Sequence, residues 1–217
     1  MKRVFLMMIL AGSALVANAQ VKFGVEGGIT FTNPKTTTPI SEIAWTPGIG
    51  IRLGGFAQYG FHENFSVRGG LVFEQKRFTN EFKVTDMMGN SGTMYHKYTL
   101  SYITIPVRVF YGLKINKGSL LFGLGPDFSI GAAAKVKATN TNDKLPAVAP
   151  SFGFGSDANE IKAFDPGFGI TVGYEFANGI GANINVVYGL SNLFNNTNNS
   201  EWFNRNSGIG VYYIFNK

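Results

Sequence analysis

Apolar and polar residues alternate with a period of two in eight separate segments of this chain. In segment 22–31, one set of alternate positions is apolar or glycine, and the other holds Lys22, Glu26 and Thr30 among glycines. Because successive side chains of a strand point to opposite faces, this pattern predicts strands with one apolar face. The predicted strands cover residues 22–31, 49–54, 65–74, 103–109, 120–128, 164–176, 180–190 and 208–215.

The second face of these segments is dominated by glycine, with scattered charges of both signs. Soluble sandwiches and lipocalin-type barrels share the period of two, so the alternation alone does not separate them from membrane barrels. A face in contact with water would carry more Lys, Glu, Thr and Ser, whereas small residues suit the crowded lumen of a narrow barrel. We therefore predict that the apolar face meets lipid and that the glycine-rich face lines a lumen.

Short and long connections alternate between the predicted strands. The short ones fall near 61–64, 116–118 and 177–179, and the long ones near 33–44, 79–93, 137–163 and 191–204. Bacterial outer-membrane barrels have short periplasmic turns and long extracellular loops. The pattern predicts an all-β fold, a transmembrane antiparallel up-and-down β-barrel of about eight strands with both termini on the periplasmic side.

The N-terminus has the features of an export signal. A basic start and an apolar or small run at 4–16 precede Ala17 and Ala19, which suit signal peptidase, so we expect the mature chain to begin at Gln20. The run is shorter than the ~20 residues that a membrane-spanning helix needs. The predicted domains are a signal peptide at 1–19 and an outer-membrane β-barrel domain at 20–217.

Composition narrows the possible functions. The chain has 28 glycines, 20 phenylalanines and no cysteine, which favours strands and excludes a lipid-attachment cysteine, a disulfide and a thiolate metal site. Its basic residues are scattered among acidic ones, so we expect no nucleic-acid partner. His62 and His96 are predicted on opposite sides of the membrane. We therefore expect no metal, no cofactor and no catalytic site.

Nine charged residues fall on predicted lumen faces. They are Glu26, Arg52, Arg68, Glu74, Lys76, Arg108, Asp127, Asp165 and Glu175. An eight-stranded barrel is just wide enough to be filled by side chains, and unpaired buried charges are costly. Five acids and four bases nearly balance, so we favour a network of ion pairs that plugs the lumen over a conduction path or a ligand site.

Several short motifs occur in an order that resembles the PorT-like outer-membrane β-barrel family. The residues that carry the resemblance are Tyr102, Ile105, Pro106, Gly125, Pro126, Gly189 and Leu190. The resemblance extends from about Gln20 to the C-terminus and implies an outer-membrane location, with a link to protein secretion for some members. It also implies that Pro106, Pro126 and Pro166, which lack a ladder donor, lie at bulges or rims.

Together these features predict a non-enzymatic integral protein of the Gram-negative outer membrane, with a structural, surface-interaction or secretion-associated role and a side-chain-filled lumen. The expected partners are outer-membrane lipid and a protein bound through the extracellular loops. We expect loop 137–163 to be exposed and variable, although it is long enough to fold over the barrel mouth. A small porin for polar solutes is the alternative, and a barrel enzyme would use His96 or Asp165 near a rim.

Overall fold

The structure is a computed structural model that describes residues 21–37, 42–43, 45–157, 160–195 and 200–215. The predicted signal peptide, with Ala17 and Ala19, and Gln20 lie outside these residues. Among the described residues, no helix has the length and apolar character needed to span a membrane.

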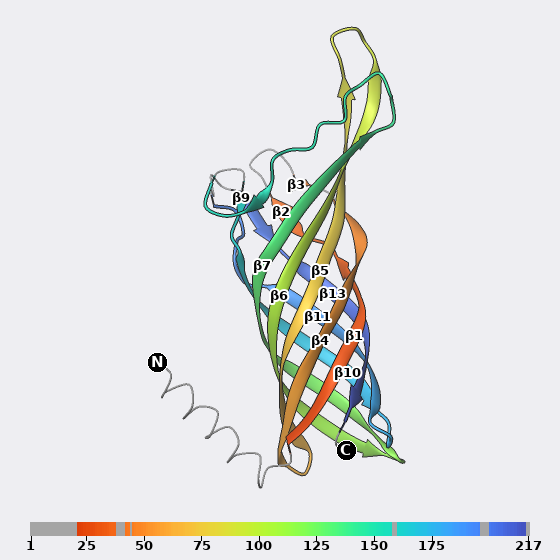
Figure 1. Cartoon of the computed structure of the whole chain (residues 1–217), viewed down its shortest axis with the longest axis vertical. Helices are drawn as coiled ribbons and strands as arrows, with labels where there is room; N and C mark the ends of the chain where they lie inside the picture. Colours follow the sequence, from red (N-terminus) through yellow and green to blue (C-terminus); the bar gives the residue numbers. More distant parts are fainter. Residues whose placement is uncertain (1–20, 38–41, 44, 158–159, 196–199, 216–217) are drawn as a thin grey trace.

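Eight antiparallel strands form a closed barrel (Figure 1). In order around the barrel they are β1 (Val21–Thr32), β4 (Thr46–His62), β5 (Phe65–Thr85), β6 (Ser91–Ile115), β7 (Gly118–Asn140), β10 (Phe164–Glu175), β11 (Ile180–Gly189) and β13 (Arg205–Ile214). Strands that follow one another in this order also pair, and β13 pairs with β1 to close the ring. The prediction of an eight-stranded up-and-down barrel is confirmed.

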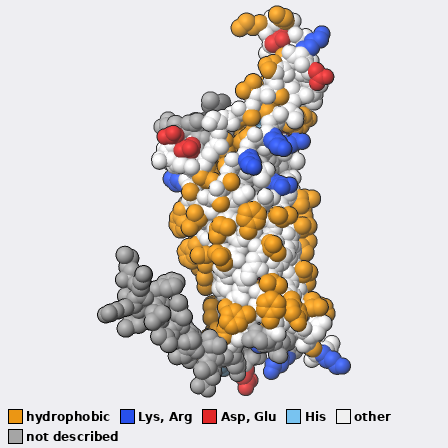
Figure 2. Space-filling view, viewed as in Figure 1, with side chains coloured by type: hydrophobic (Ala, Val, Ile, Leu, Met, Phe, Trp, Pro, Cys, Tyr) orange, Lys and Arg blue, Asp and Glu red, His pale blue; other side chains and the backbone are white. Residues whose placement is uncertain are grey.

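The pleat of each strand sorts its side chains between two environments. On β10, Phe168 and Ile170 are exposed on the outside, while Asp165 and Thr171 are buried inside. Figure 2 shows the exposed apolar side chains as a band across the visible face of the barrel, with charged side chains beyond it at both ends. A soluble protein would not expose so much apolar surface, whereas the hydrocarbon of a bilayer requires it.

Strands β5, β6 and β7 are much longer than the others and project beyond the barrel as a twisted ribbon (Figure 1). β6 has 25 residues, against 10 for β13, and is roughly 80 Å long at about 3.3 Å per residue. The expected loop at 79–93 is therefore wrong, because β5 and β6 continue to Thr85 and Ser91. Water and the following loop surround this ribbon, with Met94 and Leu145 buried between them, so its sequence lacks the continuous apolar face that reveals the other strands.

The tip of the ribbon is a tight turn built on Asp86. The backbone N–H groups of Met88 and Asn90 donate to Asp86 Oδ1, and the Asn90 side-chain amide donates to Oδ2 at 2.8 Å. These hydrogen bonds, with that of the Asn90 side chain the strongest, lower the pKa of the Asp86 carboxyl. The turn is thus stabilised by an ionised Asp86.

Short strands arise in the remaining long loops. β2 (Lys35–Thr37), β3 (Glu42–Ile43) and β12 (Glu201–Phe203) form a small sheet, and β8 (Gly153–Phe154) pairs with β9 (Glu160–Ile161). The expectation that loop 137–163 is simply exposed is wrong for its second half, because Ile161 is buried and Phe154 packs against the same cluster. This loop returns to the barrel mouth.

Gly50 of β4 leaves space for a side chain that bridges two other strands. The Thr30 hydroxyl of β1 donates to the Gln75 carbonyl of β5 at 2.7 Å, and a Cβ atom on Gly50 would overlap that carbonyl oxygen. The pairing of β4 with β5 is irregular at this point, between Pro47 and Arg52. The hydroxyl therefore supplies a donor where the ladder is interrupted.

We predict that Gly50→Ala destabilises the barrel by about 1–3 kcal/mol, because the added methyl group overpacks a fixed backbone contact. The measurement is the urea concentration at which the protein loses its folded electrophoretic mobility without heating. Gly69→Ala is the matched control, because a Cβ atom at Gly69 meets nothing within 4 Å. Equal shifts for the two variants would contradict this account of Gly50.

Candidate functional site

The interior of the barrel is the candidate functional site, and all nine charged residues predicted for it lie on the inner face. Seven of them have 7% or less of their surface exposed: Arg68, Glu74, Lys76, Arg108, Asp127, Asp165 and Glu175. The side chains of Arg52 and Glu26 are 13% and 14% exposed. The structure divides these residues into three ion-paired groups and a fourth set, in which Arg68 lies among aromatic rings with Glu175 nearby.

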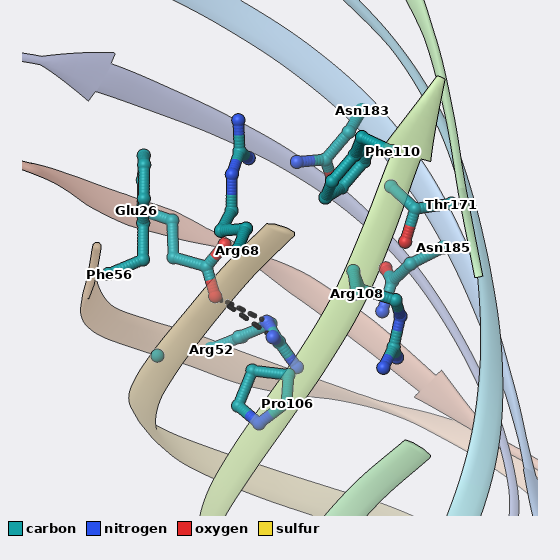
Figure 3. A pocket seen from close by; sticks show the side chains of 11 residues that line it. Glu26, Arg52, Phe56, Arg68, Pro106, Arg108, Phe110, Thr171, Asn183 and Asn185 are labelled. Atoms are coloured by element: carbon teal, nitrogen blue, oxygen red, sulfur yellow. Dashed lines mark hydrogen bonds and ion pairs between the residues drawn. The ribbon is translucent and has the colours of Figure 1, made fainter. Parts of the chain in front are cut away.

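Arg52 connects two carboxylates in the first group. Its Nη2 and Nε atoms donate to Glu26 Oε1 at 2.9 and 3.2 Å (Figure 3). Its Nη1 lies 3.9 Å from Glu74 Oε2. The Asn206 amide donates to Glu74 Oε1 at 2.6 Å and also forms a hydrogen bond with Thr32. Four strands, β1, β4, β5 and β13, are joined through this group.

Arg108 of β6 forms the second group with the backbone of β7. Its Nη1 lies 2.6 Å from Asp127 Oδ1 and donates to the carbonyls of Gly125 and Pro126 at 3.0 and 2.9 Å. A Cβ atom on Gly125 would overlap the Val107 carbonyl, so only glycine allows the two strands this approach. The guanidinium thus satisfies carbonyls at a place where proline interrupts the ladder.

The three prolines do not all lie where the resemblance implied. Pro106 pairs with Asp127, and the register between β6 and β7 is the same at Val109, so neither Pro106 nor Pro126 marks a bulge or a rim. The one register shift between these strands is at Ser101 and Tyr102. Arg108 donates to the backbone carbonyls beside these prolines, which have no N–H group, and the strands stay in register. The expected bulge at Pro106 and Pro126 is therefore wrong. Pro166, the third residue of β10, does lie near its strand end.

Lys76 and Asp165 form the third group, nearest the long-loop end. Lys76 Nζ lies 2.8 Å from Asp165 Oδ2 and 4.3 Å above the Tyr102 ring. The Asn204 amide donates to the same carboxylate oxygen at 2.7 Å. Asp165 is therefore engaged inside the barrel, whereas His96 lies on the ribbon against the Phe82 ring. The structure does not bring the two candidate enzyme residues together.

Arg68 is held by aromatic rings. Its guanidinium carbon lies 4.3, 4.8 and 4.5 Å from the ring centroids of Phe56, Phe110 and Tyr212. Its Nη2 and Nε donate to the Gln58 side-chain oxygen at 2.6 and 2.9 Å. The Tyr212 hydroxyl in turn donates to Glu175 at 3.4 Å. Cation–π contacts of this kind are strongest where water is excluded.

Little space remains between these groups. A cavity of about 40 Å³ lies among Glu26, Arg52, Arg68 and Arg108, as Figure 3 shows, and one of about 10 Å³ lies beside Lys76. One water needs roughly 10–15 Å³, so the larger cavity holds a few waters. Arg52 Nη1 and Arg108 Nε, which lack a hydrogen-bond partner among the described residues, are suited to bind them. Neither cavity has room for a solute.

An aromatic cluster covers the lumen at the long-loop end, and we call it the mouth cluster. Its buried residues are Phe78, Leu100, Tyr102, Ile161, Leu193 and Trp202, and Trp45, Tyr98, Ala134, Phe152, Phe154 and Phe194 pack against them. The Phe152 and Trp202 rings stack at 5.9 Å. Sequence reasoning missed this cluster, although large aromatic residues inside polar loops are a signal that a loop packs against the barrel.

The family-motif residues are spread over the barrel. Tyr102 belongs to the mouth cluster, Ile105 is exposed on the outside, and Pro106, Gly125 and Pro126 surround Arg108. At the start of the last long loop, the N–H of Gly189 donates to the Asn204 carbonyl, and that of Leu190 to the Pro166 carbonyl. These motifs maintain the barrel, and they form no shared binding site among the described residues.

Comparison with known families identifies the fold. The family model described as the outer membrane protein beta-barrel domain matches residues 16–195. The chain belongs to this family. The barrel is thus located in the Gram-negative outer membrane. Its orientation, with short turns in the periplasm and long loops outside the cell, stays a prediction. The narrower PorT-like label stays a prediction.

Comparisons with individual proteins are more distant. Among curated proteins, none matches the chain. Neisserial surface protein A is 13% identical, with 89% of this chain and 97% of that chain covered and a TM-score of 0.43. Ail, the attachment invasion locus protein of Yersinia pestis, is 14% identical, with 89% and 98% covered and a TM-score of 0.38. The outer membrane enzyme PagL is 9% identical, with 86% and 98% covered and a TM-score of 0.37. No function follows from likenesses of this degree.

We predict that Lys76→Met destabilises the barrel by about 3–5 kcal/mol, because it leaves the Asp165 carboxylate buried without its cation. In the double variant Lys76→Met/Asp165→Asn, a neutral amide replaces the carboxylate, and we expect most of the stability to return. Urea unfolding followed by electrophoretic mobility measures both. Lys83→Met, on the exposed ribbon, is the control. A double variant no more stable than the single one would show that the ion pair is not what holds this layer.

Proposed function

We propose that this outer-membrane barrel is a non-conducting, non-enzymatic protein that presents its extracellular surface to a protein partner. The observation that carries the proposal is the occupied lumen, in which ion pairs between strands lie beneath the mouth cluster. A conducting pore needs a continuous wet path, but the spaces beside these ion pairs measure only about 40 and 10 Å³. A structural interior leaves the outer surface as the functional part.

The ribbon formed by β5, β6 and β7 supports a surface role. It carries Met87 and Met88 at its tip, 108% and 90% exposed, far from the membrane. Methionine side chains are flexible and polarizable, and they recur at surfaces that bind other proteins. The Asp86 turn keeps the two side chains at the end of a rigid hairpin. The tip of the ribbon is therefore the surface that we assign to a protein partner.

A non-enzymatic role is supported by the surroundings of the best catalytic candidates. Asp165 binds Lys76 and Asn204 beneath the mouth cluster, where a substrate has no access. His96 packs edge-on against Phe82 on the ribbon. A general base and an acid must lie within hydrogen-bond reach of the same substrate, and these two residues do not share a site.

In planar bilayers, we expect the purified mature protein to produce no stable single-channel steps, because the lumen charges are paired and the mouth is covered. A general porin measured in the same bilayers controls for insertion. Large, reproducible steps from the wild-type protein would contradict the proposal and support the alternative, a small porin for polar solutes.

A photo-crosslinking residue placed at Met87 in living cells should yield one discrete crosslinked band, because the ribbon tip contacts the partner. The matched control position is Val148, which is also apolar and exposed on an extracellular loop. The Met87→Ser/Met88→Ser variant should weaken the band of a crosslinker placed at the nearby exposed Thr85. Equal crosslinking at 87 and 148, or no band at 87, would contradict a partner at the tip.

A further inference from the structure

A basic groove lies on the outside of the barrel, directly beyond the extracellular edge of the apolar band. It is a hollow of about 610 Å³ that crosses β4, β5, β6 and β7, and four of its lining residues are the cations Arg77, Lys97, Lys135 and Lys137. Figure 2 shows Lys and Arg side chains gathered just above the band on this face. The groove is separate from the lumen and from the ribbon tip.

The strand register brings these cations close to one another. Arg77 pairs with Thr99, which pairs with Lys135, and one step farther out Lys97 pairs directly with Lys137. Like charges opposite each other destabilise a sheet unless an anion lies between them. This arrangement therefore favours a bound anion.

The lysines of the groove lack carboxylate partners within the described part of the chain. Lys97, Lys135 and Lys137 form none of the ion pairs found there, and Arg77 donates to the Gln75 side chain at 2.8 Å. Glu81, the nearest carboxylate on the outer face of β5, lies beyond Thr79, farther from the membrane, and makes no such ion pair. The four positive charges are thus available to an external ligand.

The groove lies just outside the lipid headgroup layer, within reach of its long basic side chains. Phe73 and Ile103 are the last apolar outward residues on β5 and β6, and Arg77 lies four residues beyond Phe73. Four residues along a strand tilted by about 40° rise about 10 Å. The headgroup layer of a bilayer begins at the edge of the hydrocarbon and is about 5–8 Å thick, and long basic side chains reach toward it.

We propose that the basic groove binds the phosphate groups of the anionic glycolipid that forms the outer leaflet of the outer membrane. The acyl chains lie against the apolar band below, where Ile49, itself part of the groove lining, is 59% exposed. The phosphates lie between Lys97, Lys135 and Lys137, whose mutual repulsion they relieve. The inference rests on the membrane location and on the groove, and it does not depend on the proposed function.

The test titrates purified mature protein in neutral detergent micelles with lipid A that carries two phosphates. Native mass spectrometry measures the bound fraction. Each cation near an anionic surface contributes about a factor of five in affinity. We therefore expect Lys97→Gln/Lys135→Gln/Lys137→Gln to bind about 100-fold more weakly than wild type. The control variant Lys83→Gln/Lys114→Gln/Lys144→Gln loses the same charge from exposed sites elsewhere and should bind like wild type.

Two further probes separate the possible sources of the phosphate. Dephosphorylated lipid A should bind weakly to all variants, and inorganic phosphate should not compete at millimolar concentration. Equal binding of the groove and control variants, competition by inorganic phosphate, or tighter binding of a soluble sulfated oligosaccharide would overturn the assignment to lipid. Unfolding in urea confirms that the groove variant is folded, and the single variant Lys137→Gln, with an expected fivefold loss, repeats the test with minimal change.

Discussion

The small circumference of an eight-stranded barrel is the constraint on which the rest of this protein depends. Side chains on the inner face cannot avoid one another, so each charge must meet an opposite charge, an amide or an aromatic ring. Arg52 joins Glu26 and Glu74, Lys76 meets Asp165, and Arg68 lies among aromatic rings. Contacts across the lumen thus add to the strand pairing around the ring.

Because the barrel is narrow, we assign the binding of protein and lipid to its outer surface. Paired charges occupy the lumen, and the loops cover its long-loop end with aromatic side chains, which is why we propose a structural interior. The surfaces that remain are the tip of the long ribbon, which faces solvent, and the basic groove, which faces lipid headgroups. The ribbon tip joins β5 to β6, and the groove crosses these two strands, β7 and the edge of β4. β5, β6 and β7 are the longest strands of the barrel.

The barrel strands could be predicted because each has one face toward lipid and one toward the lumen. Apolar and small or polar residues therefore alternate along each strand. The ribbon and the small sheet of β2, β3 and β12 escaped prediction because water or other loops surround them and no apolar face results. Alternation also placed nine charges on the inner face, but it carries no information on partners. Lys76 and Asp165 are 89 residues apart, and only the barrel register brings them together. Arg108 likewise meets backbone carbonyls that no side-chain pattern indicates.

The mouth cluster contains both tryptophans, so their fluorescence can follow the folding of the barrel. The two tryptophans of the chain, Trp45 and Trp202, lie with ring centroids 5.4 Å apart, although they flank β4 and β13 at opposite ends of the sequence. Contacts between such distant segments form late, because the ring must close before the loops can meet. Indole emission from this protein therefore reports the closure of β1 against β13, the step that turns a sheet into a barrel.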